Sequence, residues 1–152
     1  MIDIRYMDDI EKINENIEYF DDIIKLSVEA KNYLNSFDWC RNINRGWLAQ
    51  EWGYVLCVFY FEITPRPDSK ADNFVWIVVG DLPTVYIDIE SATNVKEVLE
   101  SYIFLMQDWI DQVNNGKSID NCYPIEVKPT KKMAKMLEGR IKIIKDDFIN
   151  QL

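Results

Sequence analysis

The sequence contains no histidine among its 152 residues. Histidine is the side chain most often used as a general base, as a pH switch near neutrality and as a zinc ligand. Its absence excludes Ser-His-Asp and Cys-His catalytic machinery and zinc sites that depend on histidine. Most of the usual catalytic arrangements are therefore closed to this chain.

Glycine is also scarce, with five residues, and the common phosphate-binding and nucleophile motifs are missing. The chain has no G-x-x-x-x-G-K, G-x-G-x-x-G or G-x-S-x-G pattern and no D-x-D-x-D-G calcium loop. Carboxylates are plentiful, so a paired-acid or magnesium-dependent hydrolase stays open on residue types alone. Its candidate residues are Asp81, Asp88 and Glu90.

Cysteine occurs three times, at Cys40, Cys57 and Cys122, without a C-x-x-C pair. This predicts neither a disulfide framework nor a thiolate zinc site, and it fits a reducing cytosol. No apolar run approaches the roughly 18 residues that a membrane span needs, and the first residues lack the pattern of a signal peptide. We expect a cytoplasmic protein with no membrane partner, no metal and no cofactor.

Negative charge is in excess, with 26 acidic residues against 17 basic ones, a net charge of -9 and a pI near 4.5. Affinity for nucleic-acid phosphates comes mainly from clustered lysine and arginine, so we expect no nucleic-acid partner and favour a basic protein. The charge is uneven: residues 1–30 and 31–116 each carry -6, whereas residues 117–152 carry +3.

The pattern near the N-terminus predicts one long amphipathic helix over residues 8–37, which Asn14–Asn16 could interrupt. Apolar residues recur at steps of three and four from Ile10 to Val28, and no glycine or proline interrupts them. The opposite face of this helix would carry an acidic stripe, formed by Glu11, Glu15, Glu18, Asp22 and Glu29. Like charges spaced four apart destabilise a helix slightly, so the stripe is either the solvated side of the helix or a docking surface for a basic partner.

Three β-rich runs follow, over residues 54–61, 74–79 and 84–89, and they predict a three-stranded antiparallel meander. The run at 54–61 is apolar at both alternating sets of positions, which is typical of a strand covered on both faces. The stretch 38–50 before it is polar and is expected to form a loop. That loop contains Trp39, Arg41, Arg45 and Trp47, which could pack under the sheet or contact a partner.

Two C-terminal helices complete the expected fold. Asn94 and Thr130 are candidate N-caps, and Asn115-Gly116 would end the first of the two helices. Gly139 inside the second helix suggests a close helix crossing. The whole chain, residues 1–152, is predicted to be a single α+β domain with a long N-terminal helix, the three-stranded meander and two C-terminal helices.

The string Gly80-Asp81-Leu82-Pro83-Thr84-Val85-Tyr86 is the most distinctive local motif. Its glycine, aspartate and proline suit a tight turn between strands, and Asp81 could instead contact a partner. With Trp76-Ile77-Val78-Val79 before it and a helix ending near Trp109 after it, the string resembles an uncharacterised group of small bacterial proteins that share a G-D-L-P-T-x-Y motif. Asp38-Trp39-Cys40 echoes the same group, and the resemblance implies no catalytic residues.

In charge, size and lack of catalytic residues the chain also resembles the acidic immunity proteins that neutralise bacterial polymorphic or contact-dependent toxins. This resemblance implies a non-enzymatic inhibitor that covers the basic groove of a cognate toxin, with a nuclease as the favoured kind of toxin. A small-molecule-binding or regulatory module is the alternative, and the carboxylate hydrolase is the third hypothesis. The candidate partner-binding residues are Glu11, Glu15, Glu18, Asp22, Asp81, Arg45 and Trp47.

Overall fold

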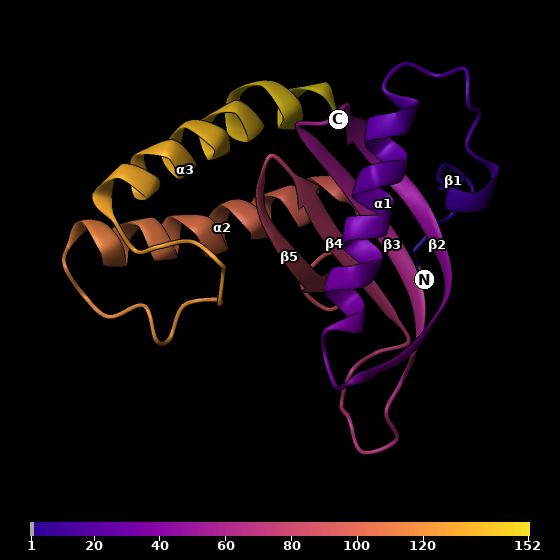
Figure 1. The fold of residues 1–152 in the computed structure, drawn as a ribbon, viewed down its shortest axis with the longest axis horizontal. Coiled ribbons are helices and arrows are strands. Elements are labelled where there is room, and N and C mark those ends of the chain that lie inside the picture. Colours follow the sequence, from indigo (N-terminus) through magenta and orange to yellow (C-terminus); the bar gives the residue numbers. More distant parts are fainter. Residues whose placement is uncertain (1) are drawn as a thin grey trace.

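The computed structural model describes residues 2–152 (Figure 1). Its elements are, in order, β1 (Asp8–Asp9), the 3-10 turn η1 (Ile10–Lys12), α1 (Phe20–Asn35), β2 (Cys40–Trp52), β3 (Leu56–Pro65), β4 (Phe74–Gly80), β5 (Leu82–Asp88), α2 (Val95–Asn114), α3 (Lys131–Ile143), the π-helical turn η2 (Ile144–Phe148) and the 3-10 turn η3 (Ile149–Gln151).

The sheet has five antiparallel strands in the order β1-β2-β3-β4-β5, so the expected three-stranded meander is wrong. The three predicted strands are present as β3, β4 and β5, whereas the stretch expected to be a loop forms most of β2. The pairing of β2 with β3 shifts register at three places, near Asn42, Arg45 and Gln50. Each irregularity interrupts the alternation of side chains, which is why this polar stretch does not show the period of a strand.

The first helix also differs from expectation, because α1 begins at Phe20 and not at residue 8. The Asn14 side chain accepts a hydrogen bond from the Asn16 N–H, and Tyr19 adopts a left-handed conformation with φ +62°. Such local bonds and conformations end helices rather than continue them. The expected single acidic helix face is therefore distributed over η1, an irregular segment at 13–19 and the first turns of α1.

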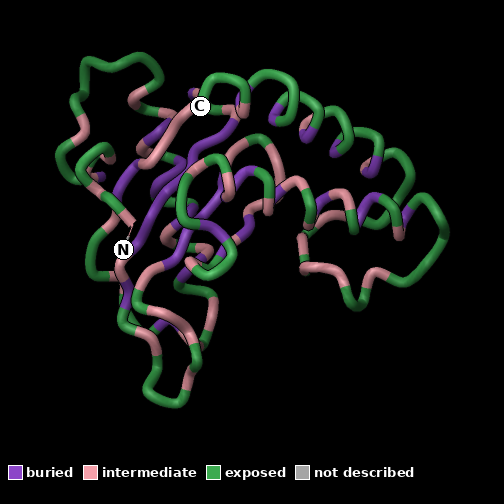
Figure 2. Tube along the Cα trace, turned by 180° about the vertical axis from the view of Figure 1, so that it is seen from behind, coloured by how far each residue is buried: buried purple, intermediate pink, exposed green. Residues whose placement is uncertain are grey.

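The sheet is covered on both faces (Figures 1 and 2). One face of β3 and β4 packs against α1 through residues such as Phe59, Phe61 and Ile77, and the other packs against α2 through Val58 and Trp76. The sheet ends at β1 on one side and at β5 on the other, and among residues 2–152 no further strand pairs with either of them.

Both C-terminal helices begin where the sequence predicts. The Asn94 side chain accepts from the Glu97 N–H at 2.9 Å, and Thr130 accepts from the Met133 N–H at 3.2 Å. The turns after α3 return to the sheet, where the Phe148 ring stacks on Trp52 at 4.5 Å between centroids. Within residues 2–152, none of the helices has the length and apolar character to cross a membrane.

Two glycines provide a test of this packing. Gly80 has φ +155°, and a β-carbon there would collide with the Val55 carbonyl, whereas a β-carbon at Gly139 would meet nothing within 4 Å. The expected close crossing at Gly139 is therefore wrong.

We predict that Gly80→Ala lowers the free energy of unfolding by about 2–4 kcal/mol. Gly139→Ala should raise it by about 0.5–1 kcal/mol because alanine restricts the unfolded chain. Urea denaturation of both variants measures this, and similar effects at the two positions would contradict the packing described.

Candidate functional site

The seven predicted site residues fall into three separate places. Glu11, Arg45 and Trp47 lie together where β1 pairs with β2, and Glu15, Glu18 and Asp22 lie before and within the first turn of α1. Asp81 lies apart from both groups, at the turn between β4 and β5.

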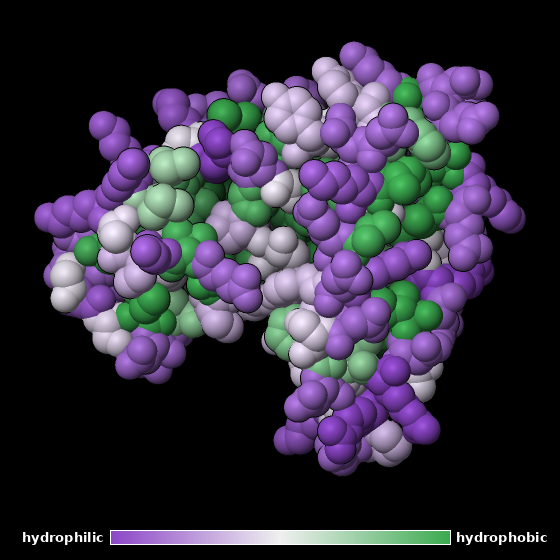
Figure 3. Space-filling model, viewed as in Figure 1, coloured by the Kyte–Doolittle hydropathy of each residue, from purple (hydrophilic) through white to green (hydrophobic). Residues whose placement is uncertain are grey.

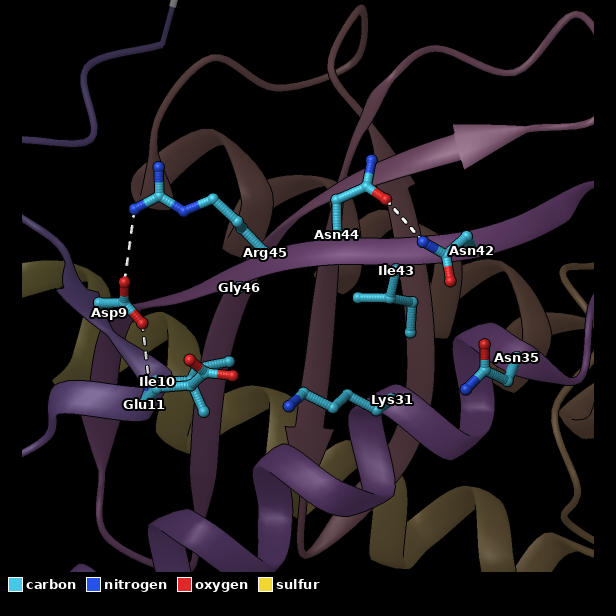
Figure 4. A pocket seen from close by; sticks show the side chains of 10 residues that line it. All are labelled: Asp9, Ile10, Glu11, Lys31, Asn35, Asn42, Ile43, Asn44, Arg45 and Gly46. Carbon is cyan, nitrogen blue, oxygen red and sulfur yellow. Dashed lines mark hydrogen bonds and ion pairs between the residues drawn. The ribbon is translucent and has the colours of Figure 1, made fainter.

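A polar cleft of about 310 Å³ lies between α1 and the β1–β2 pair (Figure 4). On one side of it the Arg45 guanidinium contacts the Asp9 carboxylate at 3.4 Å, and Asp9 also accepts from the Glu11 N–H at 3.0 Å. The Glu11 N–H first and Arg45 next lower the pKa of Asp9 below its usual value. The cleft thus keeps Asp9 ionised and holds Glu11 at its rim.

The floor of the cleft is formed by α1 and β2. Figure 4 shows the Lys31 side chain extended from α1 towards Glu11, and in residues 2–152 no carboxylate lies within 4 Å of its ammonium. On β2 the Asn42 side chain donates to Asn44 at 2.7 Å, and Asn44 donates to Thr64 at 3.0 Å. These groups give the cleft one free cation and several amides, which suit a small polar ligand better than an apolar one.

Trp47 belongs to the core and is not a free anchor for a partner. Its side chain is 4% exposed and packs against Tyr60, with the Arg45 guanidinium 4.8 Å above its ring. Trp47 therefore positions Arg45 through a cation–π contact. Of the predicted Trp–Arg pair, only Arg45 is available to a ligand.

Two tyrosines that the sequence analysis did not single out lie beside the acidic residues of α1. Tyr19 and Tyr54 are 46% and 56% exposed, and their rings meet edge to face at 6.3 Å. The Tyr19 ring also covers Gly53, where an added β-carbon would lie 3.1 Å from it. The left-handed backbone of Tyr19 is unfavourable for a residue with a side chain by about 1–2 kcal/mol. The fold thus presents an exposed aromatic side chain from a left-handed backbone position, at a cost in stability.

Carboxylates neighbour this tyrosine pair along the chain, both next to Tyr19 and, through Glu51, next to Gly53 and Tyr54. Among residues 2–152 none of them has a lysine or arginine nitrogen within 4 Å. We call the whole surface the acidic tyrosine patch, which consists of Tyr19, Tyr54, Glu15, Glu18, Asp21, Asp22 and Glu51.

The carboxylates of the patch have different structural roles. Glu51 accepts from the Gly53 N–H at 2.6 Å, and Asp22 lies in the first turn of α1, where negative charge favours the helix. The pKa of the buried Cys57 thiol is raised to about 12, first by burial and then by the nearby carboxylates of Glu51 and Asp22. Glu15 and Glu18 are exposed on the segment before the helix, visible in green in Figure 2, and have no such role.

The other carboxylates considered for catalysis are spread along β5. Asp81 precedes this strand of seven residues and Asp88 ends it, which separates them by about 20 Å. The part of the chain that the structure describes holds no cluster of three or more acidic or cysteine side chains arranged for a metal ion. Asp81, Asp88 and Glu90 therefore do not form one catalytic centre in this geometry.

The comparisons add no relative. No family model matches the chain, and neither the curated proteins nor the solved structures give a significant match.

Asp81 has a structural partner, which yields a prediction. Arg140 of α3 donates from Nη2 to the Asp81 carboxylate at 2.8 Å and from Nε to the Asp81 carbonyl at 2.9 Å. Because Asp81→Ala keeps the bond to the carbonyl, it should lower the free energy of unfolding by about 0.5 kcal/mol. Arg140→Ala loses both hydrogen bonds and the packing of the Arg140 side chain. This variant should therefore lower the free energy of unfolding by about 1–2 kcal/mol. Urea denaturation of the two variants would contradict this if Asp81→Ala were the more damaging.

Proposed function

We propose that this chain is a non-enzymatic acidic binding protein of the immunity or inhibitor type. It acts in the cytoplasm by covering the positively charged groove of a basic partner protein, with a nuclease-like toxin as the partner that fits best. The observation that carries this proposal is the acidic tyrosine patch, where an exposed aromatic pair is fixed among carboxylates that have no cationic partner.

The tyrosine pair supplies the anchor of the interface. Tyrosine adds a large contact area with few rotatable bonds, and binding energy concentrates on such side chains near the centre of an interface. Gly53 and Tyr54 hold the Tyr19 ring, so little conformational freedom remains to be lost on binding. The cost of the left-handed Tyr19 backbone is thus offset by a smaller loss of conformational entropy on binding.

The carboxylates supply the selectivity. A surface of one sign steers an oppositely charged partner towards it and rejects partners of like charge. Glu15 and Glu18 lie on the outside of the patch, where they would meet lysine and arginine side chains that otherwise hold the phosphates of a nucleic acid. Occupation of that groove would exclude the substrate without any chemistry by the inhibitor.

The test uses the product of the gene beside the one that encodes this chain. In Glu15→Lys, Glu18→Lys and Asp22→Lys combined, we expect at least a hundredfold loss of affinity for that product, measured by calorimetry at 150 mM salt, because the favourable charge contacts become repulsive. The control reverses Asp68, Glu138 and Asp147, which removes the same charge from other surfaces and should change the affinity by less than fivefold. Unchanged sub-micromolar binding by the patch variant would contradict the proposal.

A small-ligand module is the second candidate, and the polar cleft at Lys31 favours it. A ligand with a carboxylate would meet the Lys31 ammonium, which Figure 4 shows on the α1 side of the cleft, whereas the Arg45 side chain is turned towards Asp9. A thermal-shift screen of small carboxylates and amino acids should then find a compound that raises the melting temperature of the native chain. The same compound should lose its effect in Lys31→Met, whereas Lys25→Met on the same helix should respond as the unmodified chain does. Equal responses of the two variants would remove the cleft as the site.

A further inference from the structure

The strand β5 ends the sheet, and its outer edge has no neighbouring strand among residues 2–152. The Tyr86 N–H donates to the Tyr123 hydroxyl at 3.0 Å, which shows that it points away from β4. Alternate residues of an antiparallel strand direct both backbone groups to the same side, so the Tyr86 carbonyl and the Asp88 N–H point outward as well. Such an edge is a template for a further strand, and proteins normally cover or charge it.

The Tyr123 hydroxyl stands where the carbonyl of a further strand would stand. Tyr123 belongs to the irregular segment at 115–130, which joins α2 to α3 and hangs below them in orange in Figure 1. Its ring lies 5.4 Å from the Tyr86 ring, and its hydroxyl also meets that of Tyr33 on α1. Burial is the main cause that raises the pKa of both Tyr33 and Tyr123, so the two hydroxyls stay neutral and hydrogen-bonded. A side chain, and not a strand, therefore occupies the edge.

Hollows lie on both sides of this edge. On the side of α2, a groove of about 530 Å³ is bordered by Tyr86, Tyr123 and Phe104, whose side chain is 73% exposed. On the side of α1, a hollow of about 570 Å³ lies between α1 and the 115–130 segment, and Figure 3 shows this side of the molecule as concave. Side chains of an added strand would alternate between these two hollows, as the pleat of a sheet requires.

The charged side chains that line these two hollows are carboxylates, whereas Lys70 lies with Tyr86 and Asp88 around a further hollow. Asp88 and Glu100 line the groove beside Phe104, and Glu126 lines the hollow on the other side. No lysine or arginine of residues 2–152 lines either of them. Positive charge on a segment that enters here favours its binding, because its lysine or arginine side chains can pair with these carboxylates.

We propose that the outer edge of β5 binds an extended segment of a partner protein that carries lysine or arginine residues. The segment adds to the sheet as a sixth strand, takes the Tyr86 N–H from Tyr123, and pairs with the outward Tyr86 carbonyl and Asp88 N–H. One of its apolar side chains covers Phe104 in the groove beside α2, and the basic side chains that alternate with it enter the opposite hollow, towards Glu126. This surface is separate from the acidic tyrosine patch, and the inference does not rest on the function proposed above.

The experiment titrates the full chain, labelled with nitrogen-15, with a capped seven-residue peptide of alternating lysine and valine. The matched control peptide has glutamate in place of lysine. We expect saturable chemical-shift changes of the Tyr86 and Asp88 amides and about tenfold slower exchange of the Asp88 amide, whereas the Val85 and Ile87 amides, which face β4, keep their exchange rates. The glutamate peptide should bind at least tenfold more weakly. Unchanged Tyr86 and Asp88 amides, or equal binding of both peptides, would overturn the proposal.

Variants separate strand addition from simple charge attraction. Phe104→Ala should weaken the lysine peptide about tenfold, and Val28→Ala, at an exposed apolar position on α1, should leave its affinity within twofold. Tyr123→Phe removes the hydroxyl that competes for the Tyr86 N–H, so it should tighten binding about threefold. Weaker binding in Tyr123→Phe would show that the peptide does not replace this hydroxyl. Reversal of Glu15, Glu18 and Asp22 should change peptide affinity by less than twofold at 150 mM salt, so a failure here is distinct from a failure of the proposed inhibitor function.

Discussion

The burial of β3 and β4 on both faces is the constraint on which the rest of the structure depends. From Leu56 to Phe61 and from Val75 to Val79 every residue is buried, so both faces of the sheet need an apolar cover. α1 supplies one cover and α2 the other, and each uses the stripe of its helix to do so. With the faces occupied, only the strand edges, the helix ends and the connecting segments remain to meet other molecules. The candidate sites described above all lie at such places.

The same constraint explains which parts of the fold the sequence could predict. The strands β3, β4 and β5 and the helices α2 and α3 have strong local signals, because their apolar periods and caps agree with their surroundings. β2 could not be predicted in this way. Its polar residues face outward near an edge, and its irregular register comes from pairing with β3, a contact that local propensity does not contain. The start of α1 was predicted too early, because Ile10, Ile13 and Ile17 continue a helical spacing although the chain is irregular there.

The residues of the candidate site also differ in whether a local sequence signal predicts them. Acidic residues are visible in any sequence, but Glu15, Glu18 and Asp22 were predicted to share one helix face, and of these three only Asp22 lies in α1. Tyr19 and Tyr54 were not predicted, because they are 35 positions apart in the chain and meet only when the turn after β2 folds back onto the start of α1. Asp81 shows the reverse case. Its motif is distinctive in sequence, but its partner Arg140 comes from α3, and the pair fixes a turn to a helix. A distinctive string therefore indicated packing, while the exposed aromatic side chains gave no local signal.

The acidity of the chain has a structural consequence as well as a functional one. Self-repulsion opposes the compact state, and few of the carboxylates relieve it through ion pairs, since the five pairs among residues 2–152 lie mostly at exposed positions. A sheet buried on both faces can tolerate this, because its stability comes from apolar packing that pH and salt change little. The surface is then free to hold unpaired charge at the two places where backbone or aromatic groups are also available, the start of α1 and the edge of β5. Charge alone attracts many basic molecules, but charge beside a fixed tyrosine or an open strand edge selects a partner by shape, and that combination distinguishes a recognition surface from a merely soluble one.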